Sequence, residues 1–196
     1  MNANKSGAPE SAPESILTHK DRYFSENNQI ISEKEANLRL KNLYLANHRQ
    51  KFPSIPENCR CTPAAWTGKP SNALTRKVID FLRLSSHWAE RVSNTGRMVD
   101  NRKTFVDVAG RARTIGTVSW IKGSGTRGTS DIHASIAGRS VFIEIKTGAD
   151  KMSAHQVEYA QKVRNAGAEY WIVRTFGDFL LQYDAFVSSL KNNCHE

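Results

Sequence analysis

Three side chains in the second half of the sequence have types and a spacing that could do chemistry together. Glu144 and Lys146 stand two residues apart in a run that is otherwise apolar, and Asp131 precedes Glu144 by thirteen residues. Because the side chains of a β-strand alternate between two faces, Glu144 and Lys146 would share one face, with Cα atoms roughly 6–7 Å apart. A carboxylate and an ammonium are costly to bury in such a run, so their presence indicates a use.

The surrounding residues predict a β-hairpin that brings the third side chain to the other two. Residues 130–137 and 140–146 are rich in β-branched side chains, and a glycine lies between them. In this hairpin Asp131 lies opposite the region of Ile145–Lys146, so its carboxylate converges with that of Glu144. Two carboxylates and the main-chain carbonyl of Ile145 form an oxygen-rich site suited to Mg²⁺ or Mn²⁺.

Such a site could hydrolyse a phosphodiester bond. A metal ion polarises a phosphate and lowers the pKa of the attacking water, and a lysine beside it can orient that water and help to deprotonate it. The predicted catalytic residues are therefore Asp131, Glu144 and Lys146. The predicted metal ligands are Asp131, Glu144 and the carbonyl of Ile145.

These residues resemble a known nuclease motif. Asp131, followed by residues 144–146, resembles the PD-(D/E)xK motif, with Ser130 where many members have proline. The continuations at 146–156 and 165–174 look like the VRR-NUC branch of that superfamily. The resemblance implies a restriction-endonuclease-like α/β core, in which helices flank a mixed central sheet. It also implies a metal-dependent DNA endonuclease with Mg²⁺ or Mn²⁺ as cofactor.

The resemblance spans residues 71–185 and adds further expectations. It places Gln156 next to the metal site as a fourth catalytic residue, although Ser153 and Gln156 also have the spacing of a capping box, in which Gln156 caps its own helix. The family places an acid near the start of its first helix; the corresponding stretch here has none, which leaves Glu90 or Asp80 as a third carboxylate. Cleavage of branched DNA, such as a four-way junction or a flap, by a homodimer is also implied.

The distribution of charge indicates a polyanionic partner. The chain has a net charge of +9, and residues 91–127 hold eight Lys and Arg against two acids. This segment predicts a basic hairpin, with strands at 104–109 and 114–121, that grips DNA phosphates beside the active site. A solvated hairpin with charged edges is the alternative. The candidate nucleic-acid-binding residues are Arg97, Arg111, Arg113, Lys122 and Arg127.

A glycine-rich stretch at 123–128 matches the spacing G-x-G-x-x-G. In a dinucleotide-binding fold this stretch must be followed by a helix whose N-terminus holds the pyrophosphate. The residues that follow here predict a strand, so we reject that function. A loop over the site, with Lys122 and Arg127 near DNA phosphates, is expected instead.

The rest of the sequence predicts one nuclease-like domain with an N-terminal extension. Residues 1–14 are expected to form a disordered tail, 15–70 a helical arm with a proline-rich connector, and 71–190 the nuclease-like domain. Without a long apolar run, a secretion signal or an even cysteine count, we expect a cytoplasmic protein with no membrane partner. The other predicted elements are a helix at 32–50, a helix from Ser71 or Asn72 to Leu84, a strand at 88–94, a helix at 153–166, a strand at 169–175 and a helix at 176–190.

Two other functions stay open on the sequence alone. One is a sequence-specific restriction-type endonuclease on the same fold, although no separate DNA-reading motif is visible. The other is a catalytically idle nucleic-acid-binding accessory protein. The intact set of Asp131, Glu144 and Lys146 favours catalysis, because a pure binder gains nothing from carboxylates that face a polyanion.

Overall fold

The centre of the protein is a four-stranded mixed β-sheet. The structure is a computed structural model that describes residues 30–192 without 94–95, 122 and 124, so the tail predicted at 1–14 lies outside the described residues. The strand order is β1-β6-β7-β8, in which β1, β6 and β7 are antiparallel and β8 is parallel to β7. The strands are β1 (Trp88–Arg91), β6 (Ile132–Ile136), β7 (Arg139–Ile145) and β8 (Glu169–Val173).

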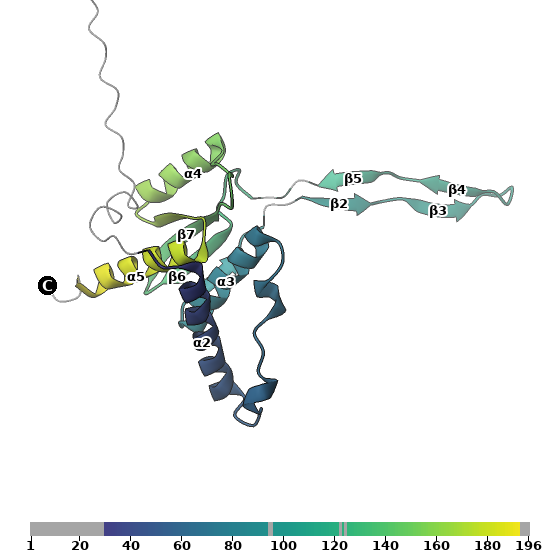
Figure 1. Cartoon of the computed structure of the whole chain (residues 1–196). Helices are drawn as coiled ribbons and strands as arrows, with labels where there is room; N and C mark the ends of the chain where they lie inside the picture. The colour runs from purple at the N-terminus through teal and green to yellow at the C-terminus, as the bar shows by residue number, and fades with distance from the viewer. Residues whose placement is uncertain (1–29, 94–95, 122, 124, 193–196) are drawn as a thin grey trace, which may run out of the picture.

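Helices cover both faces of this sheet (Figure 1). One face shares a large buried cluster with α2 (Glu33–Lys51), α3 (Pro70–Leu84) and α5 (Phe176–Asn192), and the other packs a smaller cluster against α4 (Ala154–Asn165). The two-residue period of β7 divides its side chains, because Val141 and Ile143 join the large cluster while Phe142 joins the smaller one. The mixed sheet flanked by helices agrees with the predicted α/β architecture.

The predicted hairpin of residues 130–146 is present as β6 and β7. Its turn consists of Ala137 and Gly138, both with positive φ (48° and 79°), which is the backbone of a type I′ turn. Ile136 therefore pairs with Arg139 and Ile132 with Ile143. The hairpin is centred slightly earlier than the sequence suggested, which shifts the pairing of the strands.

The large cluster rests mainly on α3 and α5. The apolar side chains Leu74, Val78, Ile79 and Leu82 of α3 are buried. Phe81 packs edge-on against three aromatic rings of α5: Phe176, Phe179 and Tyr183. The start of α3 differs from the prediction, because Pro70 occupies its first turn and no side chain caps it. Proline suits this position, since the first helical N–H groups have no partner within the helix.

Helix α2 ties the N-terminal third to the same core. Ser32 caps the helix by accepting a hydrogen bond from the Glu35 N–H, and Ala36 and Leu40 are buried in the large cluster. Arg39 also forms a two-pronged ion pair with Asp184 of α5, with N–O distances of 2.6 and 2.8 Å. Two short 3₁₀ turns (Glu57–Cys59 and Ala64–Trp66) follow in the proline-rich connector. In the described part of the chain, no helix has the length and apolar character needed to cross a bilayer.

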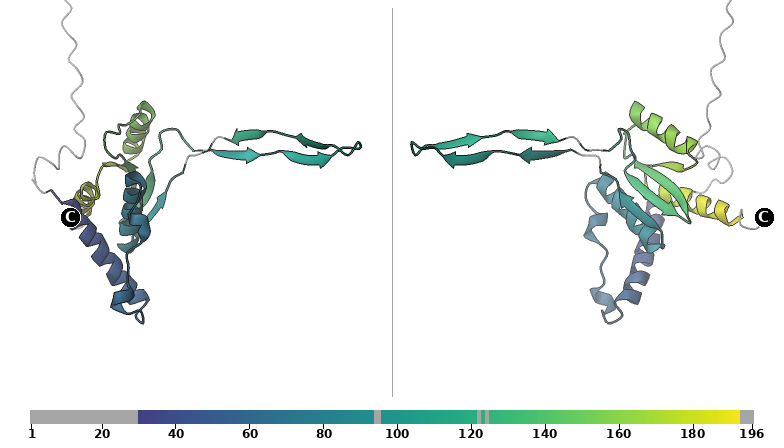
Figure 2. Two further views of the ribbon diagram at one scale, coloured as in Figure 1. Left: turned by 45° about the vertical axis from the view of Figure 1, so that its right-hand side comes forward. Right: turned by 180° about the vertical axis from the view of Figure 1, so that it is seen from behind.

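A long two-stranded ribbon, residues 97–121, projects from the body of the protein (Figures 1 and 2). Its inner half pairs β2 (Arg97–Asp100) with β5 (Val118–Ile121), and its outer half pairs β3 (Lys103–Val106) with β4 (Ala112–Ile115), in one continuous register. The basic hairpin predicted at 104–121 is thus present but longer. The prediction that all of it lies beside the active site is wrong, because the tip points away from the sheet.

Candidate active site

Asp131 and Glu144 lie side by side on the face of the sheet that α4 covers. The pairing of Ile132 with Ile143, continued by one residue, sets Asp131 opposite Glu144 rather than opposite Ile145–Lys146 as predicted. The Asp131 carboxylate accepts a hydrogen bond of 2.9 Å from the Ile145 N–H. This bond turns the carboxylate across the ladder toward β7, so the two acids converge as the sequence indicated.

Glu144, Lys146 and Gln156 form one buried network. The Lys146 ammonium lies 3.2 Å from Glu144 Oε1, 3.0 Å from Gln156 Oε1 and 3.3 Å from Asp150 Oδ2. The Gln156 amide also donates to Glu144 Oε1. Glu144 and Lys146 are only 2% and 5% exposed. The three predicted residues therefore meet, and Asp150 is a partner that the sequence analysis missed.

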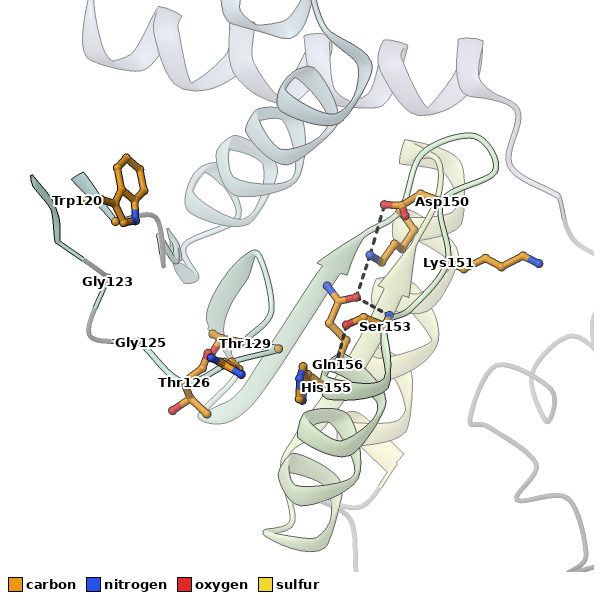
Figure 3. A pocket seen from close by; sticks show the side chains of 14 residues that line it. Trp120, Gly123, Gly125, Thr126, Thr129, Asp150, Lys151, Ser153, His155 and Gln156 are labelled. Carbon is orange, nitrogen blue, oxygen red and sulfur yellow. Dashed lines mark hydrogen bonds and ion pairs between the residues drawn. The ribbon is translucent and has the colours of Figure 1, made fainter. Parts of the chain in front are cut away.

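Gln156 serves this network and caps α4 at the same time. Its Oε1 accepts from the Ser153 N–H at 2.9 Å, while Ser153 Oγ accepts from the Gln156 N–H, so the predicted capping box is present. The same Oε1 accepts from Lys146. The two alternatives considered for Gln156 are thus compatible, because one amide is shared by the helix cap and the buried network (Figure 3).

The glycine-rich loop before β6 is pinned against the first turn of α4. Gly128 has φ +79°, and a Cβ built on it would lie 2.2 Å from the His155 carbonyl oxygen and 2.8 Å from the Gln156 nitrogen. No other residue fits there without displacing the backbone. The loop leads into Asp131 and strand β6, not into a helix, which agrees with the rejection of a dinucleotide-binding motif.

Burial and charge shift the protonation of the network. Burial, followed by the negative charge of Asp131, raises the pKa of Glu144 to about 7, while Lys146 opposes the rise. Burial also works against the charge of Lys146, but its bonds to Glu144 and Asp150 outweigh this and raise its pKa. Lys146 is therefore an ammonium at neutral pH, and Glu144 is a carboxyl poised to lose its proton when a cation approaches.

Two buried oxygens in the described part of the chain have no hydrogen-bond partner: Glu144 Oε2 and the Tyr170 hydroxyl. Tyr170 lies on the same face of the sheet, and burial, then the charges of Glu144 and Asp131, raise its pKa. A buried oxygen without a donor is costly. A cation at Glu144 Oε2 would remove that cost.

The donor set fits a hard divalent cation with few protein ligands. Asp131, Glu144 and the Ile145 carbonyl offer oxygen only, and Mg²⁺ commonly uses one or two carboxylates and keeps several waters. Within the described ranges no group of three or more His, Cys, Asp or Glu side chains could hold a metal ion. Of the two candidate third carboxylates, Asp80 does not join the site, since it accepts from Trp66 Nε1 and Arg76 Nε instead. Glu90 lies on β1, opposite His133 of β6.

A cleft of about 750 Å³ opens beside Lys146 and Gln156 (Figure 3). Its walls come from the base of the ribbon, the glycine-rich loop and the first turn of α4, and the basic side chains among them are Arg127, Lys151 and Lys146. Trp120 lines the end nearest the ribbon. The cleft is thus a basic groove with an aromatic rim.

The five predicted nucleic-acid-binding residues do not gather at this cleft. Arg127 lines it, Arg97 lies at the base of the ribbon, and Lys122 is outside the described residues. Arg111 and Arg113 lie at the ribbon's outer end, where Arg113 pairs with Asp107 at 2.7 Å. The expectation that these two residues grip phosphate beside the active site is therefore wrong.

Comparison with known proteins assigns the chain to no family. A scan against models of protein families finds no match, and a search of curated proteins finds no relative. The observed class is a mixed α/β protein whose central sheet carries a buried acid–lysine network beside a basic cleft. Its function is inferred from this geometry.

Proposed function

We propose that the protein is a metal-dependent nuclease that hydrolyses phosphodiester bonds in DNA. Asp131, Glu144, Lys146 and Gln156 would be its catalytic residues. The observation that carries the proposal is Glu144, a buried carboxyl whose Oε2 has no partner and which lies between Asp131 and Lys146. Such an arrangement lowers the stability of the fold, so its presence supports a catalytic role for these residues.

Lys146 would act as a hydrogen-bond donor and a positive charge. Because its pKa is raised, Lys146 holds its proton at neutral pH in the metal-free protein. Three oxygens lie within 3.3 Å of its ammonium, so one of them must give way when a substrate arrives. Asp150 is the one most easily exchanged, since its side chain is 59% exposed and its bond is the longest of the three. The freed N–H would then reach a phosphate oxygen or the attacking water.

Asp131, Glu144 and the Ile145 carbonyl would hold the cation. When bound, Mg²⁺ or Mn²⁺ would supply polarisation of the phosphate and a lower pKa for water. The role of Gln156 is to hold the Lys146 ammonium and the Glu144 carboxylate in fixed directions by bonding to both. Fixed donors are effective because they need no reorganisation during the reaction.

The basic cleft and the family resemblance support DNA as the substrate. Arg127 and Lys151 line the cleft beside Lys146, so a phosphate backbone that enters it would pass the catalytic residues. The resemblance to VRR-NUC and PD-(D/E)xK nucleases further suggests cleavage of branched DNA by a homodimer. The two alternative functions are a restriction-type endonuclease and a catalytically idle binding protein, and the experiment below distinguishes them from this proposal.

Cleavage of a labelled DNA panel tests the proposal. A four-way junction, a flap, a splayed arm, a single strand and a plain duplex are incubated with Mg²⁺ or Mn²⁺, with Lys146→Ala as the test variant. Lys162→Ala is the matched control, because Lys162 forms an exposed ion pair with Glu158 on the outside of α4. We expect metal-dependent cuts in branched DNA from the wild type and the control, and none from Lys146→Ala.

The other outcomes discriminate between the alternatives. Cutting at one sequence of plain duplex would favour a restriction-type enzyme. Binding without cutting in either metal would favour the idle binding protein, and cutting that survives in Lys146→Ala would refute the site.

A further inference from the structure

The ribbon carries an unusual amount of exposed apolar surface. Eight of the thirteen exposed large hydrophobic side chains in the described part of the chain belong to residues 97–121. They are Met98, Phe105, Val106, Val108, Ile115, Val118, Trp120 and Ile121. An isolated two-stranded ribbon is only marginally stable in water. Side chains of this kind, on an element that stands clear of the core, indicate a surface that becomes covered (Figure 2).

The apolar side chains lie on both faces of the ribbon. Residues that pair directly across two antiparallel strands share a face, so Met98 lies beside Trp120 on one face, and Arg97 lies beside Ile121 on the other. A flat partner would cover only one face. A groove covers both, because its walls enclose whatever is inserted into it.

The charge of the ribbon selects the partner. It has five basic residues against two acids, a net charge of +3. Arg102 and Arg113 pair with Asp100 and Asp107. The remaining three, Arg97, Lys103 and Arg111, have side chains with no hydrogen bond or ion pair to any described residue. A second copy of the same ribbon would be repelled, whereas a polyanion would be attracted.

The tip forms a hydrogen-bonded turn in spite of its exposure. Asp107 Oδ1 accepts from the N–H groups of Ala109 and Arg111, both at 2.9 Å, and Gly110 has φ +76°. Asparagine and aspartate stabilise turns in this way. The turn presents Val108 at its apex with a relative exposure of 110%. The tip is therefore preorganised to contact something outside the protein.

From these observations we infer that the ribbon is a second DNA-binding element, which lies in a groove of duplex DNA away from the cleavage site. The major groove admits a two-stranded β-ribbon. Residues 97–108 extend about 40 Å at roughly 3.3 Å per residue, which exceeds one turn of duplex at about 34–36 Å. The unpaired cations would contact phosphates along the walls, and Val106 and Val108 would contact sugars and bases inside the groove. The inference deepens the proposed function and rests on it for the choice of DNA.

A ribbon that grips a distant turn of duplex makes binding depend on the length of the DNA. The test compares branched DNA with arms of roughly 6 and 20 base pairs, where the longer arm spans nearly two turns at about 10.5 base pairs each. Affinity is measured in EDTA, so that binding is read without cleavage. In a shortened variant, Asn-Gly replaces residues 101–117; this keeps the pairing of β2 with β5 and supplies a two-residue turn.

We expect the wild type to bind long arms at least tenfold more tightly than short arms, and the shortened variant to bind both equally. The double variant Lys103→Gln, Arg111→Gln should lower the slope of log affinity against log salt by about 1.8, since each lost phosphate contact accounts for about 0.9. Lys41→Gln, on the exposed surface of α2, is the control and should leave the slope unchanged.

Equal preference for long arms in the shortened variant would overturn the inference. It would also be overturned if the shortened variant changed only the oligomeric state, measured by light scattering, because the ribbon would then contact a second copy. A different result would refute the proposed function. If binding in EDTA depends on arm length but no DNA is cleaved in Mg²⁺ or Mn²⁺, the inference about the ribbon holds and the protein is not a nuclease.

Discussion

Replacing Glu144 with glutamine should make the metal-free protein more stable at alkaline pH. The pKa of this buried carboxyl is raised from 4.5 to about 7, so its folded-state pKa exceeds its unfolded-state value. Its stabilising contribution is complete below pH 4.5 and is lost as the pH rises through 7. A carboxyl whose pKa rises from 4.5 to about 7 carries a penalty of about 3 kcal/mol at pH 8, at about 1.36 kcal/mol per pH unit.

Glutamine has the size of the protonated carboxyl and keeps an oxygen that can accept from Lys146 and Gln156. We therefore expect Glu144→Gln to raise the free energy of unfolding by up to about 3 kcal/mol at pH 8 and to change it little at pH 4.5. Urea denaturation in EDTA at the two pH values measures this difference. Glu158→Gln is the control, because Glu158 is exposed and its bond to Lys162 lowers its pKa, so its effect should be small and opposite in sign.

The same variant separates strain from metal binding. Added Mn²⁺ should stabilise the wild type in proportion to the logarithm of its concentration and leave Glu144→Gln unaffected. A variant that is less stable than the wild type at pH 8 would refute the account of Glu144 as a strained carboxyl. Equal stabilisation of both proteins by Mn²⁺ would remove Glu144 as a ligand.

Three further experiments test other parts of the site. Gln156→Ala and Ser153→Ala should each lower the stability of the protein by about 1 kcal/mol, because each removes part of the helix cap. Only Gln156→Ala should also abolish cleavage. Equal activity in the two variants would show that Gln156 only caps the helix. Gly138→Ala should destabilise the fold by roughly 1 kcal/mol, and Gly128→Ala by well over that amount. Both glycines have φ +79°, but only at Gly128 would an added Cβ lie 2.2 Å from a backbone oxygen. Matching unfolding curves for the two variants would contradict this close approach. Tyr170→Phe should stabilise the metal-free protein by about 1 kcal/mol in thermal unfolding, because it removes a buried hydroxyl with no partner; a loss of stability would show that the hydroxyl is bonded.

Elements with a strong local pattern could be predicted from the sequence. The alternation around Glu144 and the capping box at Ser153 correctly gave β7 and α4. The meeting of Asp131 with Glu144 followed from the hairpin, because the strand period leaves few other arrangements.

The errors concern features that the local pattern does not determine. The register shifted because the turn uses Ala137, and alanine with positive φ is disfavoured and cannot be anticipated from its type. Asp150 joined Lys146 through the path of a turn, which Arg174 steadies by donating to the carbonyls of Gly148 and Asp150. The direction of the ribbon was also unpredictable, since alternation in a strand says nothing of where its hairpin points.

The shared amide of Gln156 makes one backbone proton a reporter of the buried network. The Ser153 N–H donates to the oxygen that also receives the Lys146 ammonium, so this amide is protected only while Gln156 stays in place. Its hydrogen-exchange rate therefore measures how often the network opens, independently of any substrate. The Gln156 N–H, which donates to Ser153 Oγ in the same capping box, is a second amide to follow, so one experiment follows both the network and the start of the helix.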